Sequence, residues 1–259
     1  MIGACERREW EEQGFFIRRG FAAKAITEAM WRRVVEISRA QWGRPGPAGD
    51  GLVLPESNLQ GGDDVGEERE RLVSKVFRLH RDPVFRDFVD SKAIVEIAEG
   101  LLGVQEIDCF LSQFIFKNPG AWGQPWHQDE HYFPFDRHPQ IGFWLAVSEA
   151  NLENGCLHVL PGSQREPVHE HIPDRRPNAN VGYVEIVDHD MSGSVSVCMQ
   201  PGDLLVFHSR LMHSSSDNES QGPRTAMVYH LAERGTKDGT PHTLVNDWMP
   251  IGDDGQGDR

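Results

Sequence analysis

The sequence WHQDEHYF, residues 126–133, holds a histidine and an aspartate two positions apart, His127 and Asp129. On an extended strand, residues i and i+2 point to the same face, so this imidazole and this carboxylate can reach one ion. A distant third ligand, His213 in the sequence MHSSSDN, would complete a set of two histidines and one carboxylate. Such a set leaves the opposite face of the ion open and is typical of non-haem Fe(II) oxygenases.

The same segment also allows a helical interpretation, in which His127 and His131 lie four residues apart, as in zinc hydrolases. Pro125 and Pro134 flank the motif and aromatic residues follow it, so a long regular helix is disfavoured. His131 is therefore expected to face the substrate or to support the ligands.

Six short runs rich in β-branched and aromatic residues surround the motif, with Gly, Pro, Asn and Asp between them. They are CFLSQFIFK, IGFWLAVSEA, GCLHVLPGS, GSVSVCMQ, DLLVFHS and RTAMVYHLAE. Several short strands bounded by turns are typical of a barrel or a double-sheet roll. The sequence thus predicts a mainly β fold with flanking helices.

The first hundred residues have a different pattern. We expect a helix around residues 6–13, a strand in GFFIRRG, a helix in FAAKAITEAMWRRVVEISRA and a further helix in FRDFVDSKAIVEIAEGLLG that ends at Gly103. These helices would occupy about residues 5–103. Residues 43–66 are rich in Gly, Pro and Asp and are predicted to be either a lid or a disordered loop. A polar tail is expected at about residues 251–259.

Length and charge exclude some classes of function. A chain of 259 residues fits one domain, residues 1–259. The net charge of −14 argues against nucleic acid as a partner. No run approaches the roughly 18 apolar residues of a membrane span, and the first residues lack the apolar run of a signal peptide, so a cytoplasmic protein is expected. The four cysteines form no CxxC pair, which disfavours disulfides and thiolate zinc sites.

Further segments accompany the motif in a fixed order: FIFKNPGAWGQPWHQD, ENGCLHVLPGSQ, PGDLLVFHSRLMHSSSDN and GPRTAMVYHLAE. With them the chain resembles the phytanoyl-CoA dioxygenase family of Fe(II)- and 2-oxoglutarate-dependent oxygenases over about residues 10–250. The likeness is greatest to short members that do not act on acyl-CoA. The resemblance implies a double-stranded β-helix, the jelly-roll or cupin-like core, at about residues 104–234, with Fe(II) as cofactor and 2-oxoglutarate and O2 as cosubstrates.

The resemblance also assigns roles to residues. His127, Asp129 and His213 match the iron ligands, and Arg224 matches the arginine that pairs with the distal carboxylate of 2-oxoglutarate. A guanidinium presents a planar fork that suits a carboxylate. Positions that match the cosubstrate pocket less closely are Ser215, Lys75, Gln113, Gln128 and Trp144. Local turn bonding of the serine and simple core packing of the tryptophan remain as alternatives.

The other histidines are assigned lesser roles by their positions. Those in strand-like runs, His158, His208 and His230, are disfavoured as ligands. Those in the polar connecting region, His169, His171 and His189, are expected to be exposed.

The implied reaction is hydroxylation of an unactivated C–H bond in a small metabolite, in a catabolic or biosynthetic pathway, with release of succinate and CO2. Family members that halogenate lack the carboxylate ligand, so Asp129 favours hydroxylation. Desaturation, epoxidation and ring formation stay open. Two other classes also remain: a zinc or manganese enzyme on a similar roll, which would need neither Arg224 nor 2-oxoglutarate, and a non-catalytic binding module. The sequence carries no signal of the oligomeric state.

Overall fold

The computed structural model describes residues 1–43, 52–59, 66–239 and 246–252. Its main sheet has eight strands in the order β1, β10, β5, β12, β4, β3, β2, and β13 also pairs with β4. These strands are β1 Phe15–Arg18, β2 Val53–Pro55, β3 Val73–Phe77, β4 Ile107–Lys117, β5 Ile141–Ala146, β10 Leu204–His208, β12 Arg224–Glu233 and β13 Met249–Ile251. Neighbouring strands of this sheet run antiparallel to one another.

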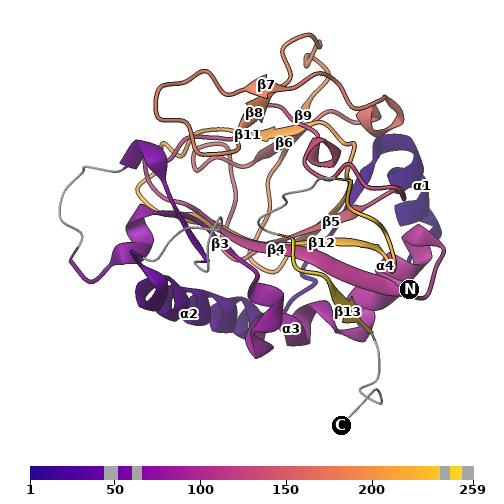
Figure 1. Cartoon of the computed structure of the whole chain (residues 1–259), viewed down its shortest axis with the longest axis horizontal. Helices are drawn as coiled ribbons and strands as arrows, with labels where there is room; N and C mark the ends of the chain where they lie inside the picture. Colours follow the sequence, from indigo (N-terminus) through magenta and orange to yellow (C-terminus); the bar gives the residue numbers. More distant parts are fainter. Residues whose placement is uncertain (44–51, 60–65, 240–245, 253–259) are drawn as a thin grey trace.

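A smaller sheet in the order β11, β6, β9 lies on the other side of the main sheet from helices α2 and α3 (Figure 1). Its strands are β6 Leu157–Val159, β9 Val195–Val197 and β11 His213–Ser215, and a separate pair consists of β7 Ile172–Pro173 and β8 Val184–Glu185. Side chains from the two sheets pack together in one apolar cluster, which includes Trp144, Leu157 and Val228. This pair of packed sheets with helices outside confirms the predicted mainly β roll.

The helices are α1 Ala4–Gln13, α2 Lys24–Gln41, α3 Pro83–Val89 and α4 Lys92–Leu102. The first three predicted elements, helix, strand and helix, are confirmed as α1, β1 and α2. The single helix predicted before Gly103 is wrong, because the chain forms two helices. Asp82 caps α3 by accepting a hydrogen bond from the Val84 amide, and α4 starts afresh after Ser91. Gly103 ends α4 in the left-handed conformation, as predicted.

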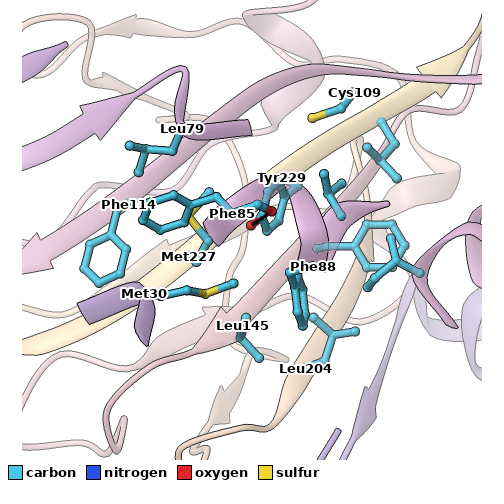
Figure 2. Packing of buried hydrophobic residues seen from close by; sticks show 14 of the residues in the cluster. Met30, Leu79, Phe85, Phe88, Cys109, Phe114, Leu145, Leu204, Met227 and Tyr229 are labelled. Atoms are coloured by element: carbon cyan, nitrogen blue, oxygen red, sulfur yellow. Dashed lines mark hydrogen bonds between the residues drawn. The ribbon is translucent and has the colours of Figure 1, made fainter. Parts of the chain in front are cut away.

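Strand β12 shows how the main sheet separates core from cavity. Its alternate residues Met227, Tyr229 and Leu231 belong to the apolar cluster shared with the helices, and Figure 2 shows Met227 and Tyr229 among Phe85, Phe88 and Leu145. The intervening residues Arg224, Val228 and His230 line a cavity on the opposite face.

The buried hydroxyl of Tyr229 gives a testable link between the sheet and α3. It donates a hydrogen bond of 2.8 Å to the carbonyl of Phe85. We expect Tyr229→Phe to lower the free energy of unfolding by about 1 kcal/mol, the usual net value of such a bond. Urea denaturation would measure the change, with Leu152→Ala as the control, because Leu152 is an exposed side chain. An unfolding midpoint of Tyr229→Phe equal to that of the wild type would contradict the prediction.

The predicted loop at residues 43–66 lies only partly within the described structure. Residues 44–51 and 60–65 are outside the described residues, but between them β2 pairs with β3, and the 3-10 helix η1 Ser57–Leu59 follows. The expected tail is also partly corrected, since residues up to Ile251 form β13 and residues 253–259 are outside the described part. No helix among the described residues is long and apolar enough to cross a membrane.

Candidate active site

His127, Asp129 and His213 come together between the two sheets, and all three are buried. The backbone of His127 pairs with that of His213 through two hydrogen bonds of 2.9 and 3.0 Å. Asp129 Oδ1 lies 3.4 Å from Nε2 of His127 and 3.7 Å from Nε2 of His213. The expected strand at the motif is wrong, because Asp129 begins a 3-10 helix, η4 Asp129–His131. Its side chain still converges with that of His127.

The hydrogen bonds of the two imidazoles direct one lone pair of each toward an ion. Nδ1 of His127 lies 2.8 Å from the carbonyl of Pro125, and Nδ1 of His213 lies 2.9 Å from the carbonyl of Leu211. A carbonyl only accepts, so both Nδ1 atoms carry the proton and both Nε2 atoms present a lone pair. The side-chain Nε2 atom of Gln124 lies 3.0 Å from Nε2 of His127, where it can donate a hydrogen bond to that lone pair. Metal-binding histidines in proteins are oriented in this way.

The charges of these three groups also suit a divalent cation. Burial raises the pKa of Asp129, but the imidazoles of His213, His127 and His230 outweigh burial and hold this pKa well below its usual range. Burial lowers the pKa of His213 to about 4. The site therefore offers one carboxylate and neutral imidazole, the protonation states that metal binding requires.

The cluster opens into a cavity of about 290 Å³ between the sheets. Five of the predicted cosubstrate residues line this cavity together with the triad: Lys75, Gln113, Trp144, Ser215 and Arg224. They come from strands β3, β4, β5, β11 and β12, so the two sheets jointly place them. The structure brings together these eight predicted residues.

Arg224 lies in this cavity with 1% of its surface exposed. Its Nε and Nη2 atoms donate to the carbonyl of Gly155 at 3.1 and 2.9 Å, and its guanidinium lies 5.5 Å from the ring centre of Trp144. Its Nη1 atom is buried and has no hydrogen-bond partner among the described residues. Burial lowers the pKa of Arg224 to about 10, so the group remains a cation at neutral pH. A buried cation with an unused donor calls for an anionic ligand such as a carboxylate.

Gly155 can approach Arg224 in this way because it has no side chain. Its φ angle is +82°, in the left-handed region, and a Cβ atom would lie 2.4 Å from the carbonyl oxygen of Ser216. Only glycine satisfies both conditions. Its carbonyl therefore orients the arginine.

The sequence did not reveal Lys117, which lies opposite Arg224 in the register of β4 and β12. It has 4% of its surface exposed, and burial lowers its pKa well below the usual value. Its Nζ atom donates to Ser215 Oγ at 2.7 Å and to the carbonyl of Ser216. The backbone N–H of Gln124 also donates to Ser215 Oγ, at 3.1 Å. Because its oxygen already accepts twice, the hydroxyl of Ser215 keeps its own proton for a ligand in the cavity.

Lys75 extends from β3 toward the same cavity. Its Nζ atom lies 3.3 Å from Gln124 Oε1 and 5.0 Å from the ring centre of Tyr183. Burial lowers the pKa of Lys75 to about 8, although the charges of Asp129 and Glu56 act in the other direction. This ammonium group therefore titrates close to neutral pH.

Gln128 does not line the cavity, so this prediction is wrong. Its side-chain amide is buried on the other side of the motif, where Nε2 donates to the carbonyls of Arg210 and Pro167 and Oε1 accepts from the amide of His169. Neighbouring residues of an extended chain point in opposite directions, and both neighbours of Gln128 point into the cavity. Gln128 fixes the surrounding loops.

Three more cavity residues were not predicted: Tyr132, Tyr183 and His230. His230 lies on β12 with Nδ1 3.8 Å from Asp129 Oδ2, and two-residue alternation from Arg224 could have identified it. Tyr183 lies in the connecting region, where no pattern marks it. His131 does not line the cavity: it is an exposed residue whose ring stacks on that of His171.

Comparisons with known proteins agree with this geometry. The family model "Phytanoyl-CoA dioxygenase (PhyH)" matches residues 10–226. Peroxisomal phytanoyl-CoA dioxygenase from Bos taurus is 28% identical over 235 residues, which cover 88% of this chain and 68% of that protein. Phytanoyl-CoA dioxygenase domain-containing protein 1 from Bos taurus is 28% identical over 269 residues, with 90% of each chain covered.

Solved structures show the same fold. EvdO2 from Micromonospora carbonacea var. aurantiaca, complexed with 2-oxoglutarate, has a TM-score of 0.67 and 25% identity, and the match covers 96% of this chain and 98% of that one. The epimerase SnoN from nogalamycin biosynthesis has a TM-score of 0.68 with 98% of this chain and 91% of that chain covered, but at 16% identity it supports the fold alone. Since the family model spans most of the sequence, the chain belongs to the phytanoyl-CoA dioxygenase family of Fe(II)- and 2-oxoglutarate-dependent dioxygenases.

Proposed function

We propose that this protein hydroxylates an unactivated C–H bond of a small metabolite, using Fe(II), 2-oxoglutarate and O2 and releasing succinate and CO2. One observation carries the proposal: the buried cluster of His127, Asp129 and His213 shares a cavity with the unpaired Nη1 atom of Arg224. A metal site and an anion site in one cavity suit a cosubstrate that chelates a metal at one end and carries a carboxylate at the other.

In this proposal His127 and His213 hold the iron through Nε2, and Asp129 holds it through its carboxylate. Bound iron supplies the activation of O2 and the oxidation of the C–H bond. Arg224 pairs with the distal carboxylate of 2-oxoglutarate, assisted by the Ser215 hydroxyl. Trp144 and Gly155 fix the guanidinium so that it meets the cosubstrate in one orientation. The carboxylate of Asp129 supports hydroxylation over halogenation, which would need its coordination position for a halide.

The size of the cavity supports a small substrate. A volume of about 290 Å³ is at the lower end of ligand-binding pockets, which run from roughly 300 to 1,000 Å³, and part of it would hold 2-oxoglutarate. A biosynthetic role stays part of the proposal, and SnoN is an example of a biosynthetic enzyme on this fold. The cytoplasmic location, the single domain and the lack of nucleic-acid binding stay predictions from the sequence.

An anaerobic titration tests the proposal. Metal-free protein receives Fe(II) and then 2-oxoglutarate, and the visible charge-transfer band of the iron chelate is recorded. We expect a band that grows with 2-oxoglutarate in the wild type and is lost in Asp129→Ala. If iron loading is confirmed and no band forms, the oxygenase proposal fails, and a zinc or manganese enzyme independent of 2-oxoglutarate replaces it.

The lowered pKa of Lys75 predicts how cosubstrate binding depends on pH. The charged ammonium attracts the 2-oxoglutarate dianion. In the metal-free protein it loses its proton as the pH rises through about 8, and Fe(II) bound at Asp129 would lower the pKa of Lys75 further. Affinity should therefore fall by about tenfold or more between pH 7 and pH 9, since binding must then recover a proton. Titrations of the Fe(II) protein across this range would measure the fall, with Lys75→Met as the control that removes it. Parallel profiles for the two proteins would contradict the prediction.

A further inference from the structure

A second group of potential metal ligands lies outside the active-site cavity. Glu166 Oε2 is 2.9 Å from Nε2 of His169 and 3.0 Å from Nε2 of His189. The ligand atoms of all three residues lie within 4.8 Å of one another. Within the described ranges, only this group and the triad meet that condition. The histidines, expected to be exposed, retain only 25% and 19% of their side-chain surface.

In one of its two neutral tautomers, His189 needs a cation between its ring and Glu166. Its Nδ1 lies 3.1 Å from the carbonyl oxygen of Asp190, while its Nε2 lies 3.0 Å from the carboxylate of Glu166. A neutral imidazole carries one N–H, so it cannot donate to both oxygens. If Nδ1 donates to the carbonyl, the Nε2 lone pair faces a carboxylate, and either an extra proton or a metal ion must lie between them. Donation from Nδ1 to a backbone carbonyl is also how metal-binding histidines are usually oriented.

The backbone holds these ligands in place from both sides. The amide of His169 donates to Gln128 Oε1 at 2.9 Å, and the amide of Ile186, near His189, donates to the carbonyl of Trp126 at 2.8 Å. Glu166 follows the 3-10 helix η5 Ser163–Arg165, and its amide donates to the carbonyl of Ser163. The three ligands are therefore attached to the framework of the roll.

From this geometry we infer that Glu166, His169 and His189 form a second metal site for a zinc-type divalent cation. Two imidazole nitrogens and one carboxylate oxygen are a common zinc donor set, whereas calcium and magnesium prefer oxygen alone. Glu166 keeps 39% of its side-chain surface exposed, so a water molecule can take the fourth position of a tetrahedral ion.

A metal ion at this site would restrain a segment that forms part of the wall of the active-site cavity. We call residues 166–189 the cover segment, because Val181, Gly182 and Tyr183 within it line that cavity. Tyr132 Oη donates to the carbonyl of Gly182 at 2.8 Å, which attaches the middle of the segment to the motif. A metal ion held by Glu166, His169 and His189 joins the two ends, which reduces the conformational freedom of everything between them.

Zinc binding to the full-length, metal-free protein tests the site. The variant Asp129→Ala/His213→Ala keeps one triad ligand, so any stoichiometric zinc that it binds belongs to the second site. We expect two equivalents of zinc in the wild type and one in this variant, by calorimetry and elemental analysis. At a hundredfold excess over Kd, zinc should raise the Tm of the variant by about 5 °C.

Further changes in the same variant assign the ligands. Adding Glu166→Gln, which keeps a hydrogen-bond acceptor but removes the charge, should weaken zinc binding more than tenfold. Adding His189→Gln should do the same, whereas His158→Gln, which changes a half-buried histidine outside both groups, should leave it unchanged. Circular dichroism checks that each protein is folded. If Asp129→Ala/His213→Ala binds no stoichiometric zinc, or if Glu166→Gln leaves zinc binding unchanged, the metal site is refuted, and Glu166, His169 and His189 are only an ion-paired cluster.

Hydrogen exchange tests whether the bound metal ion restrains the cover segment. In Asp129→Ala/His213→Ala, zinc should slow amide exchange within residues 166–189 and leave α2 unaffected. Unchanged exchange in the cover segment would overturn this role. Neither result depends on iron or 2-oxoglutarate, so the zinc site and the oxygenase proposal can fail separately.

Discussion

Asp129→Ala is expected to reduce the turnover of 2-oxoglutarate to succinate by more than about a hundredfold. Loss of a residue that merely supports a metal ligand costs about 10- to 100-fold, and Asp129 is proposed to be a ligand itself. It is also the only carboxylate of the triad, and its low pKa keeps it charged. Without it the ion would face two neutral imidazoles, so iron content should fall together with turnover.

Glu130→Gln is the matched control for this variant. Glu130 is the next residue and is also buried, but its carboxylate accepts hydrogen bonds from Ser209 Oγ at 3.0 Å and Arg210 Nε at 2.8 Å, and it does not line the cavity. This control should retain its iron and lose only stability. The assignment of Asp129 would be wrong if Asp129→Ala kept one tightly bound iron and turnover within tenfold of the wild type.

Arg224→Met is expected to weaken 2-oxoglutarate binding by about thirtyfold or more and to leave Fe(II) binding intact. Truncating one partner of a buried charge pair costs about 2 kcal/mol or more, and each 1.36 kcal/mol is about tenfold. Methionine fills much of the space over Trp144, so the change removes charge rather than volume. The carbonyl of Gly155 would also lose its donors, which should lower the Tm as well.

Titration of the Fe(II)-loaded protein with 2-oxoglutarate measures this effect, with Arg175→Met as the control. Arg175 has 72% of its side chain exposed and does not line the cavity. A change of less than threefold in Kd for a folded Arg224→Met protein would show that the distal carboxylate binds elsewhere. Because Asp129→Ala removes iron binding, whereas Arg224→Met keeps iron binding and weakens the binding of 2-oxoglutarate, the two variants separate the metal site from the anion site.

Motifs that are local or ordered along the chain could be predicted from the sequence. The spacing of His127 and Asp129, together with the family resemblance for His213 and Arg224, identified residues that the structure places in one cavity. The β runs predicted strands because β-branched and aromatic residues are enriched in strands, and Gly, Pro, Asn and Asp lie between the runs. The error at Gln128 arose because a residue between two cavity-facing neighbours was assigned to the same face.

Contacts between distant segments could not be predicted in this way. Lys117 ends a strand, where lysines are usually solvated, and only its pairing opposite Arg224 shows that it is buried beside Ser215. Glu166 and His169 are three residues apart, but no spacing links them to His189, because the cover segment folds back on itself and brings its ends together. Such closure depends on tertiary contacts that a single sequence does not display.

The alternation of directions at the motif matters for anyone who would redesign substrate choice. The side chain of Gln128 points away from the cavity and hydrogen-bonds to backbone atoms of Pro167, His169 and Arg210. Its neighbours His127 and Asp129 face the cavity. A chimera whose foreign sequence shifts the backbone at residues 167–169 would take two of the three partners from this side-chain amide, leaving the carbonyl of Arg210, and would disturb the two ligands beside it. Grafts confined to residues 174–184 leave that anchor untouched. The segment that can be exchanged in this protein is therefore shorter than the whole cover segment.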